Sequence, residues 1–146
     1  MSVRSYTKIW IHLIWGTKNR EKSLYDREFR KKASQHLAEN SVDKKIYMKI
    51  NYVNADHVHA LIDLPTNKTL EDVARLLKGE LSSWINTELA LKFNWAVGYA
   101  AFSVSESKLD TVVKYIKNQE AHHKHISFKE EYEEFLRGYN IKDLNR

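Results

Sequence analysis

The sequence contains no cysteine, one proline and four glycines among its 146 residues. Without cysteine the chain has no disulfide, no thiolate metal site and no cysteine nucleophile. Because glycine and proline are scarce, little of the chain is suited to be a linker or a low-complexity segment. No apolar run approaches the roughly 20 residues that a membrane-spanning helix needs. We therefore predict a single domain over residues 1–146 and no membrane partner.

The charge balance and the aromatic content indicate the class of partner. Residues 1–6 lack the apolar segment of a signal peptide, so we expect a cytoplasmic protein. The chain has 24 Lys and Arg against 19 Asp and Glu, a net charge of +5, and this excess favours a polyanionic partner. Four Trp and eight Tyr are available either for the core or for stacking on unpaired bases.

Two histidines flank a single valine in residues 54–64. Successive side chains of a strand point to opposite faces, so His57 and His59 share one face and Val58 faces the other. Two imidazoles on a rigid strand form half of a metal site; the alternative is a pair of hydrogen-bonded histidines on a half-exposed sheet. Asp63 alternates onto the same face, either as an acceptor that orients a ligand or as an ordinary charge at a strand end.

Hydrophobic periodicity predicts an alternation of strands and helices. Four strands are expected, over residues 6–17, 45–53, 56–64 and 94–105. Asp26 and Thr69 are the predicted N-caps of two helices, the first of which runs to about residue 40. Two more helices follow, over about 107–123 and about 127–138. The order β-α-β-β-α-β predicts the α+β, ferredoxin-like or RRM-like antiparallel sheet, with two helices on one face and the other face free.

The predicted helix over about 107–123 carries polar residues beside its apolar stripe. The stripe consists of Leu109, Val112, Val113 and Ile116. At roughly 100° per residue, Tyr115 and Gln119 lie together on one flank of this stripe, with His122 one turn further on. The alternatives are a tyrosine that packs its ring on the helix flank and a glutamine on the surface. The position of Tyr115 favours a hydroxyl directed along the edge of the docking surface.

His-hydrophobic-His on a strand, followed by Tyr-x-x-x-Gln on a helix, resembles the HUH single-tyrosine transposases of the insertion-sequence-200/605 type. Residues 11–18 also resemble the first strand of that family, and residues 115–123 resemble its catalytic helix. The resemblance extends over essentially the whole chain. It implies an enzyme that cleaves and rejoins single-stranded DNA with hairpin ends, through a 5′-phosphotyrosine, to mobilise a small insertion sequence.

The resemblance also implies roles for individual residues. Tyr115 would be the nucleophile, and His57, His59 and Gln119 would hold a divalent ion, Mg²⁺ or Mn²⁺. The added C-terminal helix that carries Tyr115 and Gln119 would be the catalytic helix. The resemblance further implies a homodimer, in which the tyrosine helix of one subunit can complete the active site of the other.

Other polar residues are candidates for contacts with the ion or with DNA. His12 is either a core histidine or a neighbour of the ion, and Lys18 begins a basic loop. His122 belongs to a histidine-rich segment with three interpretations: a second metal cluster, a DNA-facing surface or a solvated surface. The charges of the first helix are interpreted as a solvated face rather than as DNA contacts; they are Arg27, Arg30, Lys31 and Lys32.

Two alternative functions remain open at this point. One is a domesticated, repeat-associated tyrosine transposase that acts on chromosomal hairpins without being mobile. The other is a non-catalytic RRM-like module whose sheet stacks bases. The binding module predicts DNA binding that survives EDTA, with no strand cleavage.

Overall fold

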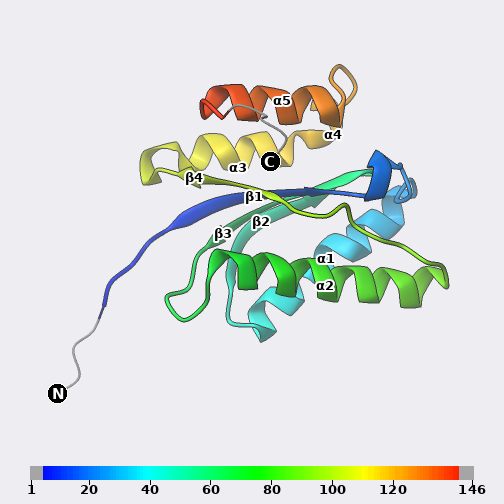
Figure 1. The fold of residues 1–146 in the computed structure, drawn as a ribbon, viewed down its shortest axis with the longest axis horizontal. Helices are drawn as coiled ribbons and strands as arrows, with labels where there is room; N and C mark the ends of the chain where they lie inside the picture. Colours follow the sequence, from blue (N-terminus) through cyan, green and yellow to red (C-terminus); the bar gives the residue numbers. More distant parts are fainter. Residues whose placement is uncertain (1–4, 142–146) are drawn as a thin grey trace.

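The computed structural model describes residues 5–141. Its first part follows the order β1 (Trp10–Gly16), α1 (Arg27–Asp43), β2 (Tyr47–Val53), β3 (His57–Asp63), α2 (Leu70–Leu89) and β4 (Ala100–Val104). The four strands form one sheet in the order β2-β3-β1-β4, and every neighbouring pair is antiparallel. The predicted α+β class and β-α-β-β-α-β order are confirmed (Figure 1). Short 3₁₀ turns, η1 (Lys18–Arg20) and η2 (Glu106–Lys108), follow β1 and β4.

Local sequence signals set the helix starts. The Asp26 carboxylate accepts from the backbone N–H of Glu28 and begins α1, and the Thr69 hydroxyl accepts from Asp72 and begins α2. Both N-caps are as predicted. Helix α1 continues to Asp43, past its expected end near residue 40. Each cap is a hydrogen bond over two or three residues and can be predicted from the local sequence, whereas the end of α1 was not predicted correctly.

All four strands are shorter than the periodicity predicts, β1 and β4 by the most. The segment before β4 contributes a single isolated bridge between Thr17 and Trp95. The Trp95 ring packs edge-on against Trp15, with centroids 5.9 Å apart. The apolar residues of this segment thus fill the core without joining the ladder, and periodicity alone does not separate the two outcomes.

One face of the sheet packs on α1 and α2. Alternate residues of β1 and β3 point into this core: Ile11, Leu13, Trp15, Val58, Ala60 and Ile62. They meet apolar residues of both helices, including Leu37, Leu77 and Leu81. Because side chains alternate along a strand, this packing directs His12, His57 and His59 to the opposite face.

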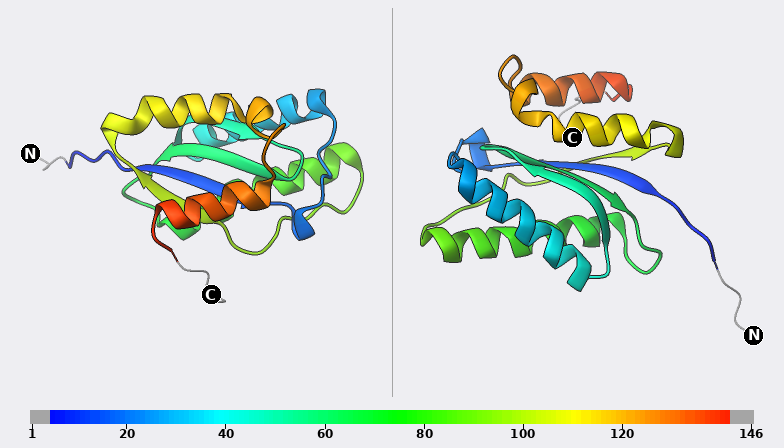
Figure 2. Two further views of the ribbon diagram at one scale, coloured as in Figure 1. Left: turned by 90° about the horizontal axis from the view of Figure 1, so that it is seen from above. Right: turned by 180° about the vertical axis from the view of Figure 1, so that it is seen from behind.

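The opposite face is also covered, and the expectation of a free face is wrong. Three helices lie over it: α3 (Leu109–Lys117), α4 (Gln119–His122) and α5 (Phe128–Gly138) (Figures 1 and 2). Helix α3 packs Leu109 and Ile116 near Trp10 and Leu61, and α5 packs Phe128 against Ile14, Ala100 and Phe102. The histidine face is therefore an interior between two layers.

The predicted helix over about 107–123 is divided in two. Asn118, with φ −94° and ψ 19°, ends α3 and precedes α4. The last helix starts at Phe128, close to the predicted residue 127, after a capping box formed by Ser127 and Glu130. Among residues 5–141, no helix is both long and apolar enough to cross a membrane.

Candidate active site

His57 and His59 lie at the start of β3 and are fully buried. The Nδ1 atom of each ring contacts a neighbouring side chain. His57 Nδ1 lies 2.7 Å from Asp56 Oδ1, and His59 Nδ1 lies 2.7 Å from His12 Nε2. Each ring consequently directs its Nε2 towards the layer formed by α3, α4 and α5, and fixing one nitrogen in this way orients an imidazole as a ligand.

Glu131 of α5 meets both histidines and was not singled out from the sequence. Its Oε1 lies 3.1 Å from His57 Nε2 and 2.9 Å from His59 Nε2. The residue is 1% exposed. The available signal was its place in α5: Glu131 lies between Phe128 and Phe135, at the spacing of an inward-facing stripe. An acidic residue within an apolar stripe is a candidate for a function.

Gln119 is the first residue of α4 and is fully buried beside the histidines. Its Nε2 donates to Glu131 Oε2 at 3.1 Å, and its Oε1 accepts from Asn54 Nδ2 at 3.1 Å. Asn54 was expected only to make the tight connection between two strands. Its side chain lies within 3.1 Å of His57 Nε2 as well, so it joins β3 to α4 inside the site.

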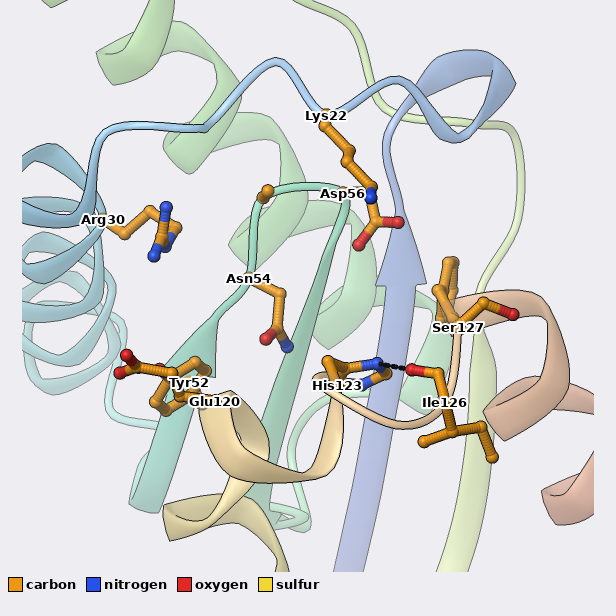
Figure 3. A pocket seen from close by; sticks show the side chains of 11 residues that line it. Lys22, Arg30, Tyr52, Asn54, Asp56, Glu120, His123, Ile126 and Ser127 are labelled. Carbon is orange, nitrogen blue, oxygen red and sulfur yellow. Dashed lines mark hydrogen bonds between the residues drawn. The ribbon is translucent and has the colours of Figure 1, made fainter.

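His123 belongs to the same cluster. Its Nδ1 donates to the carbonyl of Ile126 at 2.7 Å, drawn as a dashed line in Figure 3. Its Nε2 lies 3.2 Å from Glu131 Oε2. The ligand atoms of His57, His59, His123 and Glu131 all lie within 4.8 Å of one another. Within residues 5–141 the histidine-rich segment thus contributes to one cluster with the strand histidines and does not form a second one.

Tyr115 reaches this cluster from α3. Its hydroxyl donates to Glu131 Oε2 and lies 3.3 Å from His122 Nε2. Its ring packs edge-on against His59, with centroids 5.8 Å apart. Burial, together with the hydrogen bond and charge of Glu131, raises the pKa of Tyr115 well above its usual range. The hydroxyl is therefore held as a phenol.

The remaining candidates separate into two groups. His12 and His122 adjoin the cluster, through His59 and Tyr115 respectively. Asp63 lies away from it: the carboxylate accepts from the backbone N–H of Ile9 and lies 3.6 Å from Lys8. Alternation places Asp63 on the histidine side but roughly 13 Å along the strand from His59. Lys18 is exposed on η1.

Burial and mutual contacts shift the pKa values of the carboxylate and the histidines in this cluster. Burial alone would raise the pKa of Glu131, but its contacts with His123, His57 and His59 outweigh burial and hold that pKa well below its usual range. Burial lowers the pKa of His59 to about 4. For His57, burial opposes the charge, but the hydrogen bonds to Asp56 and Glu131 prevail and raise its pKa. A neutral imidazole and an ionised carboxylate are the forms that bind metal ions.

A cavity of about 230 Å³ opens beside the cluster (Figure 3). Asn54, Asp56 and His123 line it on the cluster side, and Lys22, Arg30 and Tyr52 line it elsewhere. A neighbouring cavity of about 340 Å³ shares Arg30 and Tyr52 and adds further basic residues, Arg27, Lys31 and Lys117. Three of the charges interpreted as a solvated helix face thus border these two cavities, together with Glu120, which lies 3.4 Å from Arg27.

Comparisons with known proteins identify the family and the fold. A family model described as "Transposase IS200 like" matches residues 5–119. A crystal structure of a candidate transposase from Deinococcus radiodurans R1 is 25% identical, with a TM-score of 0.64, over 82% of this chain and 97% of that one. A REP-associated tyrosine transposase bound to a REP hairpin shares the fold, with 17% identity and a TM-score of 0.61, over 86% of this chain and 75% of that one. Curated proteins gave no significant match.

Proposed function

Because the chain belongs to the family of IS200-like transposases, we propose that it cleaves and rejoins single-stranded DNA, with Tyr115 as nucleophile and a divalent ion as cofactor. Mobilisation of a small insertion sequence would be the outcome. One observation carries the proposal. The Tyr115 ring packs against the His59 ring, and the Nε2 atoms of His59 and His57 point to the same place, Glu131 Oε1. A binding module has no need of a tyrosine hydroxyl beside two anchored imidazoles.

His57 and His59 are the proposed ligands of the ion, with Gln119 as a third. The residues fit such an ion, because both Nε2 atoms face inwards and their partner nitrogens are already held. Gln119 directs its amide nitrogen at Glu131, and exchanging the amide nitrogen and oxygen would present the oxygen instead. When bound, Mg²⁺ or Mn²⁺ would draw charge from the scissile phosphate and favour the phenolate of Tyr115.

Tyr115 would attack the phosphorus atom of the scissile phosphodiester. A bond forms between the tyrosine oxygen and phosphorus, and the bond from phosphorus to the 3′-oxygen breaks. The phenol gives up its proton as the new bond forms, and the 3′-oxygen takes up a proton and leaves as a hydroxyl. The 5′-phosphate remains on the tyrosine. His122, 3.3 Å from the phenol oxygen, helps to orient it. Because the covalent intermediate conserves the bond energy, a 3′-hydroxyl can reverse the step and rejoin strands without ATP.

Basic side chains in the two cavities, interspersed with Asp56 and Glu120, suit the backbone of a single DNA strand. Lys22 and Arg30 would neutralise phosphates near the cluster, which supplies affinity without base specificity. Tyr52 lies between the two cavities and offers a ring on which a base can stack. Since one solved neighbour is bound to a DNA hairpin, a strand that carries a hairpin is the first substrate to test.

A homodimer is the assembly that the family resemblance implies. In this chain Tyr115 and Glu131 lie beside the histidines of the same chain. This arrangement supports a tyrosine that acts in cis, whereas a dimer can align two DNA ends. Light scattering on the purified protein measures the assembly directly.

Covalent trapping tests the proposal. Labelled hairpin-bearing single-stranded DNA and Mn²⁺ should give a protein–DNA adduct that resists denaturation. Tyr115→Phe should abolish it, whereas Tyr25→Phe, a matched change at a residue that is 81% exposed, should leave it intact. An adduct formed equally well by Tyr115→Phe would rule out this nucleophile. DNA binding that survives EDTA, with no cleavage under any condition, would instead favour a binding module.

A further inference from the structure

The carboxylate of Glu131 is enclosed by three imidazoles. Its oxygens lie 3.1 Å from His57 Nε2, 2.9 Å from His59 Nε2 and 3.2 Å from His123 Nε2. The residue is 1% exposed, and a buried carboxylate is destabilising unless positive charge or donors surround it. Glu131 lies beyond residues 5–119, which the family model matches. The match to the family model therefore gives no role to this carboxylate.

Two of the imidazoles have already used their Nδ1 hydrogen. His57 Nδ1 faces the Asp56 carboxylate, and His123 Nδ1 faces the carbonyl of Ile126. Neither oxygen carries a hydrogen, so each ring must be the donor, and in its neutral form its Nε2 has only a lone pair. Both Nε2 atoms face Glu131, which also only accepts. Asn54 Nδ2 can donate to that of His57, whereas that of His123 meets another acceptor, Gln119 Oε1. Such contacts are repulsive unless a proton or a cation lies between the atoms.

The spacing of these atoms suits a cation. In an octahedral shell, metal–ligand bonds of about 2.0–2.1 Å place neighbouring ligand atoms roughly 3 Å apart. The contacts of Glu131 with the Nε2 atoms are 2.9 to 3.2 Å. We infer that Glu131 is a direct ligand of the divalent ion and that His57, His59 and His123 complete the set. This inference rests on the proposed function, which supplies the ion, and it replaces Gln119 in the ligand set by Glu131 of α5 and His123.

The same carboxylate also connects the ion site to the nucleophile. Its Oε1 faces the two histidines of β3, while its Oε2 accepts from the Tyr115 hydroxyl. Gln119 donates to Oε2 as well, so in this arrangement it positions the carboxylate and does not itself contact the ion. Helix α5 is accordingly part of the catalytic unit, and the histidines of β3 with the tyrosine of α3 are incomplete without it.

Calorimetric titration of the metal-free full chain with Mn²⁺ tests the assignment. Glu131→Gln keeps the side-chain shape and should weaken Mn²⁺ binding at least about tenfold, since even residues that only support metal ligands typically contribute 10- to 100-fold. Glu133→Gln removes the same charge from an exposed position of the same helix and should bind as the wild type does. The absorption spectrum of bound Co²⁺, which reports the ligand set, should change only for Glu131→Gln.

Each outcome decides between the two proposals. Equal Mn²⁺ affinity and an unchanged Co²⁺ spectrum for Glu131→Gln would overturn the inference while leaving metal-dependent cleavage standing. A wild type that binds neither ion would overturn both. If Glu131→Gln unfolds, anomalous diffraction from Mn²⁺-soaked wild-type crystals settles the matter. A Glu131 oxygen in bonding contact with the ion supports the inference, and a carboxylate outside the coordination shell contradicts it.

Discussion

Gly16 lies at the end of β1, against α5. A methyl group added there does not touch the catalytic residues but should displace α5, which carries Glu131. Gly16 pairs with His57 in the sheet, and the Phe128 ring stacks on His57, with centroids 4.0 Å apart and planes 5° from parallel. A Cβ atom at position 16 would lie 2.7 Å from Phe128 Cε2. Gly16→Ala therefore forces either the ring or the helix that carries it to move.

The size of the effect follows from this contact. Carbon atoms pack at about 3.5–4.0 Å, so Phe128 must retreat by about 1 Å. Overpacking of this kind typically destabilises a protein by ~1–3 kcal/mol. Phe128 precedes Glu131 by one helical turn, so the retreat also draws the carboxylate away from His57 and His59. A misplacement of about 1 Å near reacting groups can reduce a rate about 100-fold.

Chemical denaturation and the rate of adduct formation measure the two consequences. Gly79→Ala is the matched control, because a Cβ atom there meets nothing within 4 Å; it should stabilise α2 by ~0.5–1 kcal/mol. In a Phe128→Ala background the obstructing ring is gone, so Gly16→Ala should add little further destabilisation. The two substitutions should thus be strongly non-additive.

Wild-type stability and a wild-type cleavage rate for Gly16→Ala would refute the reasoning. Additive effects of Gly16→Ala and Phe128→Ala would refute it too, because they would show that the two residues do not share a contact. A loss of stability with an unchanged rate would show that Phe128 supports the fold without positioning Glu131.

Two further predictions concern metal binding. His12→Phe keeps a ring beside His59 but removes the contact with its Nδ1, so Mn²⁺ affinity should fall about 10- to 100-fold in calorimetry; an unchanged affinity would mean that His12 does not orient the ligand. The raised pKa of His57, caused by hydrogen bonds to Asp56 and Glu131 that outweigh burial, means that a bound ion must displace a proton. Affinity should therefore fall by up to about tenfold per pH unit below that pKa and level off above it, and a titration series that shows no dependence on pH would contradict this.

The sequence gives a good account of the features that depend on local periodicity. Strand alternation placed His57 and His59 on one face. Helical spacing placed Tyr115 on the flank of the apolar stripe, but the break at Asn118 puts Gln119 in a separate helix. Asp26 and Thr69 were recognisable as caps because capping is a contact over two or three residues. The order of elements then specified the sheet, since short connections leave few topologies.

Other features depend on contacts between distant segments. Asp63 shares the periodicity of the histidines, but only the length of β3 shows that it is too far away to join them. Asn54 has the character of a turn residue, and its contacts with His57 and Gln119 appear only when α4 is placed over the sheet. By periodicity alone, the basic residues of α1 can face solvent. In the structure Tyr52 and α4 lie next to them, so these residues line cavities.

The sequence by itself determined the α+β order, the two histidines on a common face and the place of Tyr115 on the flank of its helix. Tertiary structure alone decided that α5 closes over this face and brings Glu131 and His123 to the same point. The physical reason is the range of the interactions. Periodicity and capping are set within a few residues, whereas the burial of a carboxylate among three imidazoles is stabilised only when β3, α4 and α5 are packed together.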